Sequence, residues 1–143
     1  MSRVKLVFPL TNPIFVAHIP LRITDMNYGN HLGNDVMLSI IHDARMQFLA
    51  SHGFTELNAG GVGMIMVDVT IVYKNEGFYG DNLKIEIFVH EITPKSFELF
   101  YKITTVRKEA VILIAEAKTG MLSYNYDEKK VTATSQPLLD ALQ

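Results

Sequence analysis

The sequence predicts an α+β fold in which one five-stranded antiparallel sheet packs against one long helix. Two hydrophobic periods along the chain predict it. Between residues 34 and 53, apolar residues recur at three- and four-residue spacing, the period of a helix buried on one side. Over residues 65–126, apolar and polar residues instead alternate, the period of strands with one buried face. A single sheet with one covering helix follows from this order.

The first strand is expected at residues 14–23, an apolar and β-prone stretch. Pro13 precedes it and Pro20 lies within it. Because proline cannot donate to a strand ladder, this strand should lie at an edge or be irregular. A polar, glycine-bearing loop then leads into the helix, and it brings acid, amide and imidazole side chains close to a helix N-terminus.

The long helix is expected to start at Gly33 or Asn34 and to end at Gly53. Asn34 suits an N-cap, Asp35 suits the positive end of the helix dipole, and Gly53 suits a left-handed C-cap. The buried stripe consists of Val36, Met37, Ile40, Ile41, Ala44, Phe48 and Leu49.

Four long strands are expected after the helix, in antiparallel, meander-like succession. They cover residues 65–73, 83–90, 97–105 and 110–126. Residues 137–142 are expected to form a short terminal helix. Since no repeat, linker or low-complexity tract interrupts this order, a single domain over residues 1–143 is predicted.

The composition is that of an ordinary soluble globular protein: 48% hydrophobic residues, 20% charged residues and a formal net charge of -2. This charge gives no support to nucleic-acid binding. Cysteine is absent, so disulfides and cysteine zinc sites are excluded, and no apolar run approaches the ~20 residues of a membrane span. A cytoplasmic location is expected. No metal site is predicted, since no helical i, i+4 pair occurs among His18, His31, His42, His52 and His90.

Three segments carry a resemblance to a known family. Residues 25–34 are Asp-Met-Asn-Tyr-Gly-Asn-His-Leu-Gly-Asn, residues 42–45 on the helix are His-Asp-Ala-Arg, and residues 73–83 contain Tyr-Gly-Asp-Asn-Leu. They resemble the Asp-x-Asp-x-x-Gly-His-Val-Asn-Asn, Glu-x-Ala-Arg and Tyr-Gly-Asp-x-Leu motifs of hot-dog-fold acyl thioesterases of the 4-hydroxybenzoyl-CoA thioesterase-like superfamily. The resemblance implies a hot-dog fold and hydrolysis of acyl thioesters, with acyl-CoA or acyl-ACP as substrate and no cofactor.

The resemblance breaks at Asn27, which stands where that branch has its catalytic acid, because an amide is not a base at neutral pH. The loop is similar here to the Asp-Met-Asn-x-His motif of plant acyl-ACP thioesterases, which have a glutamate in a later Tyr-x-x-Glu segment. Asp25, Asn27 and Glu76 match this pattern, and His31 matches if two extra residues are allowed. The resemblance then implies Glu76 or Asp25 as the base that activates water, with Asn27 orienting water or substrate and His31 available for proton transfer.

The helix N-terminus has a chemical role that does not depend on the resemblance. Its unpaired backbone N–H groups are aimed donors for the oxyanion that forms when a thioester carbonyl is attacked. The candidate donors lie at Gly33, Asn34 and Asp35, provided that the Asp35 carboxylate points away from them. Asp43, on the helix, is the reserve base.

Each candidate also has a purely structural interpretation. Asp25 and Asn27 are typical Asx-turn residues, His31 suits the satisfaction of backbone groups in the loop, and Glu76 suits an exposed turn. Asp43 and His42 equally suit a solvent-facing or interface pair on the helix. Because Asn27 replaces an acid, the main alternative function is a non-catalytic acyl-thioester sensor or binding protein. A hot-dog dehydratase is disfavoured because its His and acid pairing is not visible.

One helix cannot cover both faces of a five-stranded sheet, so an apolar remainder and an exposed edge call for a partner. A homodimer or homotetramer is expected, and the resemblance implies sites shared between chains. Lys74, Lys84 and Lys95 are candidate contacts for the coenzyme A tail.

Overall fold

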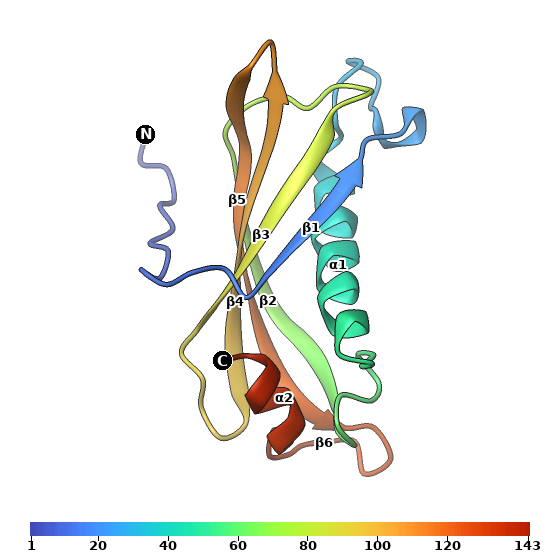
Figure 1. The fold of residues 1–143 in the computed structure, drawn as a ribbon, viewed down its shortest axis with the longest axis vertical. Coiled ribbons are helices and arrows are strands. Elements are labelled where there is room, and N and C mark those ends of the chain that lie inside the picture. The colour runs from blue at the N-terminus through green and yellow to red at the C-terminus, as the bar shows by residue number, and fades with distance from the viewer.

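The computed structural model describes all residues from 1 to 143 and places one long helix along one face of a twisted sheet (Figure 1). This is the α+β hot-dog arrangement that the resemblance implies. The elements are, in chain order, β1 (Phe15–Pro20), a 3₁₀ turn (Ile23–Asp25), α1 (Asn34–Ser51), β2 (Gly63–Tyr73), β3 (Asn82–His90), β4 (Ser96–Arg107), β5 (Ala110–Asn125), β6 (Lys130–Val131) and α2 (Gln136–Ala141).

The predicted stripe of α1 is the side that packs on the sheet. Its residues Met37, Ile40, Ile41, Ala44, Phe48 and Leu49 are buried, and Val36 packs partly against them. The N-cap is Gly33 and not Asn34, because Gly33 has an extended backbone (φ -66°, ψ 140°) and Asn34 is already helical. At the other end, Gly53 has φ +74°, the left-handed conformation expected after a helix.

The strand order β1-β3-β4-β5-β2 corrects the expected meander. Strands β3, β4 and β5 do follow one another, but β2 pairs with β5 and not with β3, while β1 pairs with β3. The segment between β2 and β3 therefore crosses from one edge region of the sheet to the other. The first strand also ends at Pro20, earlier than predicted, and the chain then enters the 3₁₀ turn.

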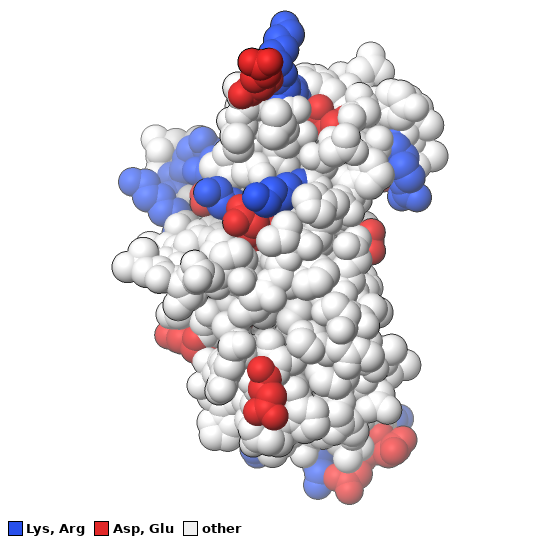
Figure 2. Space-filling model, viewed as in Figure 1, with Lys and Arg blue, Asp and Glu red and all other residues white.

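The face of the sheet toward α1 forms the core. Alternate residues of β3 and β4 point into it, as the sequence pattern predicts, and are fully or almost fully buried: Leu83, Ile85, Ile87, Leu99, Tyr101 and Ile103. On the other face, oppositely charged residues lie across from each other in neighbouring strands, such as Lys102 of β4 opposite Glu86 of β3 and Glu116 of β5. Figure 2 shows lysine, arginine and acidic side chains interspersed on the visible surface.

The N-terminal segment covers part of this outer face, which the sequence pattern did not indicate (Figure 1). The Phe8 ring packs edge-on against Phe88 and Phe100, with centroids 5.5 and 5.2 Å away. Both partners are buried although they point away from α1. Nearer the N-terminus, the Arg3 guanidinium donates to the Tyr73 carbonyl at 2.7 Å. The segment thus joins the outer face to the end of β2.

Replacing Phe8 with alanine is expected to lower the free energy of unfolding by about 2 kcal/mol, because it removes a large aromatic contact from two buried rings. Val7 is the matched control, since its side chain is 84% exposed and Val7→Ala should change stability by less than about 0.5 kcal/mol. Denaturant unfolding of the two variants tests this. Equal stability of both would show that the Phe8 ring contributes nothing to the fold.

None of the helices combines the length and the apolarity that are needed to cross a membrane.

Candidate active site

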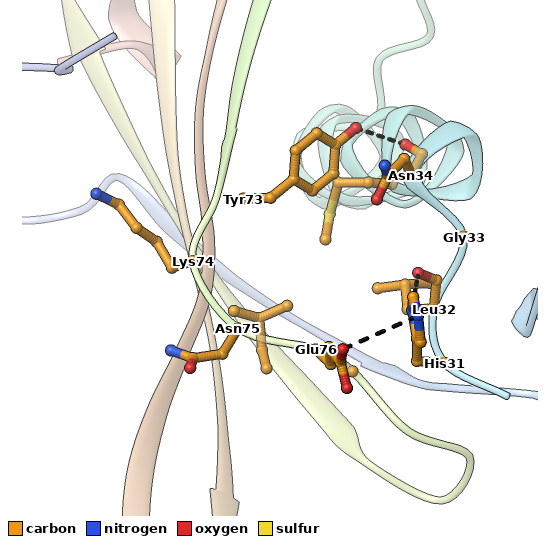
Figure 3. Close-up of a pocket in the computed structure, with 11 residues that line it drawn as sticks. His31, Leu32, Gly33, Asn34, Tyr73, Lys74, Asn75 and Glu76 are labelled. Atoms are coloured by element: carbon orange, nitrogen blue, oxygen red, sulfur yellow. Dashed lines mark hydrogen bonds and ion pairs between the residues drawn. The ribbon is translucent and has the colours of Figure 1, made fainter. Parts of the chain in front are cut away.

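A cavity of about 190 Å³ lies between the start of α1 and the chain that leaves β2 (Figure 3). Its walls are residues 31–34 with Met37 on one side, residues 73–77 on the other, and Ile114 of β5. Of the residues predicted for the site, the structure brings together His31, Gly33, Asn34 and Glu76. The strand crossover explains this placement, because it carries residues 73–77 past the loop that precedes α1.

His31 and Glu76 face each other across this cavity, with Nε2 and Oε1 4.0 Å apart (Figure 3). The other ring nitrogen, Nδ1, lies 3.4 Å from the Leu32 carbonyl oxygen. The Nε2–Oε1 distance is too long for a direct hydrogen bond, so Glu76 and His31 face each other without being bonded. The Glu76 side chain is 63% exposed, so water reaches it freely. The pair therefore combines a carboxylate open to water with a nearby proton donor.

The N-terminus of α1 presents free donors beside this pair. The N–H groups of Asn34, Asp35 and Val36 have no hydrogen-bond partner in the chain, and no side chain caps them. The Gly33 N–H is different, because it donates to the Asp25 carbonyl at 3.1 Å. Among the lining residues, Asn34 is thus the one that offers a free first-turn amide.

Asp35 does not point away from the helix N-terminus, as the oxyanion role of this turn would need. A Cβ built on Gly33 would lie 2.8 Å from the Asp35 carboxylate oxygen Oδ1, so the carboxylate lies over the first turn. Asp35 also does not line the cavity. Its charge is favourable next to the helix dipole, which gives it a stabilising role at this position.

Tyr73 is a lining residue that the sequence analysis did not single out. Its hydroxyl donates to the Asn34 carbonyl oxygen at 2.6 Å, which holds the end of β2 against the start of α1 (Figure 3). Burial raises the pKa of Tyr73, and the Asp35 charge raises it further, so the hydroxyl stays a neutral donor. The sequence feature that could have identified Tyr73 is its position as the tyrosine of the Tyr-x-x-Glu segment that ends at Glu76.

Asp25 and Asn27 lie outside this cavity, and their side chains shape the loop. The Asp25 carboxylate is buried and accepts from the Arg22 backbone N–H at 2.8 Å and from its guanidinium at 3.3 Å. The Asn27 Oδ1 accepts from the Gly29 N–H at 2.8 Å, which is an Asx turn. Asp25 instead lines a separate cleft together with Asp43, the reserve base.

A partly buried charge network holds the segment that carries Glu76. The Arg107 guanidinium donates to both Asp81 carboxylate oxygens and also to the Glu76 carbonyl at 2.6 Å. It stacks over the Phe78 ring, 4.6 Å from its centroid. Burial acts to raise the pKa of Asp81, but the Arg107 hydrogen bonds, the Phe78 N–H and the Arg107 charge outweigh it and lower this pKa. Arg107 therefore holds residues 76–81 at both ends, through the Glu76 carbonyl and the Asp81 carboxylate.

Asp81→Asn is expected to lower the free energy of unfolding by about 2 kcal/mol at pH 7, because it removes a charged partner of Arg107. Since the pKa of Asp81 is lowered in the folded protein, its contribution is complete above the pKa of the unfolded chain and disappears as pH falls through the folded value. The difference in unfolding free energy between the two proteins should thus begin to shrink as pH falls below about 4 and vanish below the lowered pKa of Asp81. A constant difference down to pH 2 would contradict this assignment.

The three candidate lysines do not converge on the cavity. Lys74 lines it but points away from His31, and its ammonium pairs with Glu116 at 3.7 Å (Figure 3). Lys84 lies on the outer face of the sheet, and Lys95 is in the turn before β4.

The one group of side chains spaced to hold a metal lies elsewhere, at the end of β3, and consists of His90, Glu91 and Glu98. Glu98 also forms an ion pair with Lys118, whose ammonium group takes the place of a cation beside this carboxylate.

A family model of the thioesterase-like superfamily matches residues 21–142, which include every part of the cavity described above. The chain belongs to the thioesterase-like superfamily. This assignment covers the loop, α1 and all the strands from β2 onward, so the resemblance to hot-dog thioesterases is confirmed. No curated protein sequence matches the chain significantly.

Three solved structures, two of them thioesterases, have the same fold. The 1,4-dihydroxy-2-naphthoyl-CoA thioesterase Slr0204 from Synechocystis is 20% identical, with a TM-score of 0.79 over 90% of this chain and 94% of the other. The gentisyl-coenzyme A thioesterase BH1999 is also 20% identical, with a TM-score of 0.76 over 90% and 100%. The Staphylococcus aureus protein SAV2348, solved in complex with CoA, is 16% identical, with a TM-score of 0.79 over 95% and 85%.

Proposed function

We propose that this protein hydrolyses acyl thioesters of coenzyme A or acyl carrier protein in the cavity between His31 and Glu76. The observation that carries the proposal is the position of a solvent-accessible carboxylate and an imidazole, 4.0 Å apart, next to free amides at a helix N-terminus. Membership of the thioesterase-like superfamily supports the reaction class, and the two CoA thioesterase structures and the structure with bound CoA support a CoA-linked substrate.

The proposed reaction uses one water and needs no cofactor. Glu76 takes a proton from water while the oxygen attacks the thioester carbonyl carbon, and the Asn34 N–H donates to the resulting oxyanion, with a strength that the Asp35 carboxylate over the same turn reduces. The tetrahedral intermediate then collapses, the carbon–sulfur bond breaks, and the thiolate takes a proton from His31. Transfer of the proton from Glu76 to His31 restores both groups. Asp25 and Asn27 are proposed to keep the loop in shape, with Asn27 oriented by its own turn.

Thiol release from short, medium, long and aromatic acyl-CoA thioesters tests this proposal, with the same acyl groups on acyl carrier protein as a second panel. Turnover of any member above the rate without enzyme supports hydrolysis and gives the substrate class. Saturable binding without turnover on both panels would support the sensor function instead. The observation that favours a sensor is Asn27, which stands where the related enzymes have a catalytic acid.

We propose further that two chains associate through β2. This strand pairs on one side only, with β5, and its Met66 and Val67 side chains are exposed. An edge with free backbone groups and exposed apolar residues is suited to pairing with a second strand. Light scattering after size-exclusion chromatography should give a dimer or a tetramer, and Val67→Lys should shift it toward the monomer. A monomeric wild-type protein would contradict this.

A further inference from the structure

A hollow of about 380 Å³, within the range of small-molecule sites, lies on the outer face of the sheet over β1, β3 and β4. α1 packs on the other face (Figure 1). The hollow shares no lining residue with the cavity at His31 and Glu76, and no residue of β2, the strand proposed for association of two chains, lines it. We call it the outer-face hollow, and its polar lining includes His18, Lys84, Glu86, Lys102 and Thr104.

A row of hydrogen-bond donors crosses the outer-face hollow. The strand register places His18 of β1 directly opposite Lys84 of β3, and Lys84 directly opposite Thr104 of β4. Residues in such positions have their Cβ atoms about 5 Å apart. Lys102 is two residues from Thr104 on the same strand, so it is a diagonal neighbour of Lys84 at roughly 7–8 Å. Two ammonium groups and an imidazole therefore converge on one place.

The fold leaves these basic groups without acidic partners. His18, Lys84 and Lys102 take part in none of the ion pairs of the chain. One acid, Glu86, lies in the hollow opposite Lys102, but the two form no ion pair. Basic residues that are close neighbours on a sheet repel each other when charged. An anion bound between them would remove this repulsion.

The Thr104 hydroxyl is a free donor in the same row. Thr104 is only 7% exposed, and its hydroxyl has no hydrogen bond within the chain, whereas the other buried threonines of the sheet, Thr105 and Thr119, are bonded. No fully buried side-chain oxygen lacks a partner, so the Thr104 hydroxyl is reached by solvent, and the residue lines the hollow. A buried threonine whose hydroxyl is open to a basic hollow points to a ligand with accepting oxygens.

One end of the hollow is apolar. Val106 of β4 and Val111 of β5 lie directly opposite each other and line it, and they are 66% and 71% exposed. Their side chains are free to contact the carbon part of a ligand whose charged group lies at the lysines.

We infer that the outer-face hollow binds a phosphate monoester, with the phosphate oxygens on Lys84, Lys102 and Thr104 and the organic group against Val106 and Val111. A phosphate dianion offers three accepting oxygens, which match donors on neighbouring strands, and its charge balances the two ammonium groups. His18 is a further donor, and Glu86 limits the affinity. The inference does not depend on the proposed hydrolysis.

Backbone amide NMR of the full-length protein locates the binding, with phenyl phosphate as the probe at pH 8, where the ester carries two negative charges. Titration should produce saturable shifts of the amides of Lys84, Lys102 and Thr104 and leave residues 31–34 and 73–77 unchanged. Absence of saturable shifts, or shifts confined to the cavity at His31 and Glu76, would overturn the inference.

Variants of the hollow test the contacts. Lys84→Met and Lys102→Met should each weaken phenyl phosphate binding by about threefold to fivefold, the effect of one exposed charge pair. Lys95→Met is the matched control, because it makes the same charge change in the turn before β4 and should leave affinity unchanged. An equal loss in Lys95→Met would show a general charge effect and overturn the inference.

Two further variants have opposite expected effects. Glu86→Gln should tighten binding by about threefold, since it removes the one negative charge of the hollow. Thr104→Val keeps the shape of the side chain and should weaken binding by about threefold through loss of the hydroxyl. Unchanged affinity in both variants would place the ligand outside the hollow.

The ligand class is tested with three compounds. Benzenesulfonate has the same ring with a single negative charge and should bind at least about threefold more weakly than phenyl phosphate. Inorganic phosphate lacks the ring and should also bind more weakly, and Val111→Ser should reduce this advantage of phenyl phosphate. Equal affinity of all three compounds would overturn the assignment to a phosphate monoester.

Coenzyme A also carries a phosphate monoester, so competition separates the two sites. Coenzyme A bound at the cavity of His31 and Glu76 should leave the affinity for phenyl phosphate unchanged. Displacement of phenyl phosphate by coenzyme A would make the hollow part of the thioester site and overturn the inference of a separate one.

Discussion

Replacing Glu76 with glutamine is expected to lower kcat by a factor of about 100 or more, the usual contribution of a general base. Glutamine keeps the size of the side chain and its approach to His31, but it cannot take a proton from water. KM should change by less than a few-fold, because Glu76 is proposed to act on water and not on the acyl group. The melting temperature should stay unchanged, since this side chain is 63% exposed.

Glu128→Gln is the matched control, an equally conservative change on an acid that is 58% exposed in the turn before β6. It should leave kcat and KM at the wild-type values. Activity of Glu76→Gln within twofold of the wild type would remove Glu76 from the reaction. The reserve base would then be Asp43, in the cleft that it shares with Asp25.

The hydrophobic period of the sequence predicts the elements of this fold but not all of their neighbours. Alternation in residues 83–90 indicates which residues face the core, and Leu83, Ile85 and Ile87 do so. The same alternation is compatible with several strand orders, because it determines the buried face and not the adjacent strand. The pairing of β2 with β5 depends on tertiary contacts along the whole strand, and this is why the expected meander fails.

The polar residues of the loop before α1 were harder to interpret, since Asp and Asn serve either to stabilise a loop or to bind a ligand. Asp and Asn side chains that bond to their own loop have the same sequence signature as side chains presented to a ligand. The structure shows the first use at Asp25 and Asn27. The burial of Arg45 was missed for the opposite reason, because a charged residue beside the apolar stripe of α1 is normally exposed, and here Glu56 and Tyr101 compensate its burial.

The placement of Glu76 relative to His31 depends on a close contact at Gly77. The Leu32 N–H donates to the Gly77 carbonyl at 2.7 Å, and this bond joins the two segments that carry the candidate pair. A Cβ on Gly77 would lie 3.1 Å from Leu21 Cδ1 and 3.1 Å from Leu32 Cβ. Both leucines are buried, at 3% and 6% exposure, so room for the new methyl group has to come from a shift of a few tenths of an ångström between the two segments.

Gly77→Ala is therefore expected to cost about 1–3 kcal/mol of stability through overpacking and to lower kcat/KM by about 10- to 100-fold through misplacement of Glu76. Gly53→Ala separates the two effects. Gly53 has φ +74° and nothing within 4 Å of an added Cβ, so alanine there costs roughly 1 kcal/mol of backbone strain far from the cavity. Denaturant unfolding and thioester kinetics of both variants should show comparable losses of stability but a loss of activity in Gly77→Ala alone. An equal drop in both activities would mean that catalysis responds to stability in general and not to the spacing between His31 and Glu76.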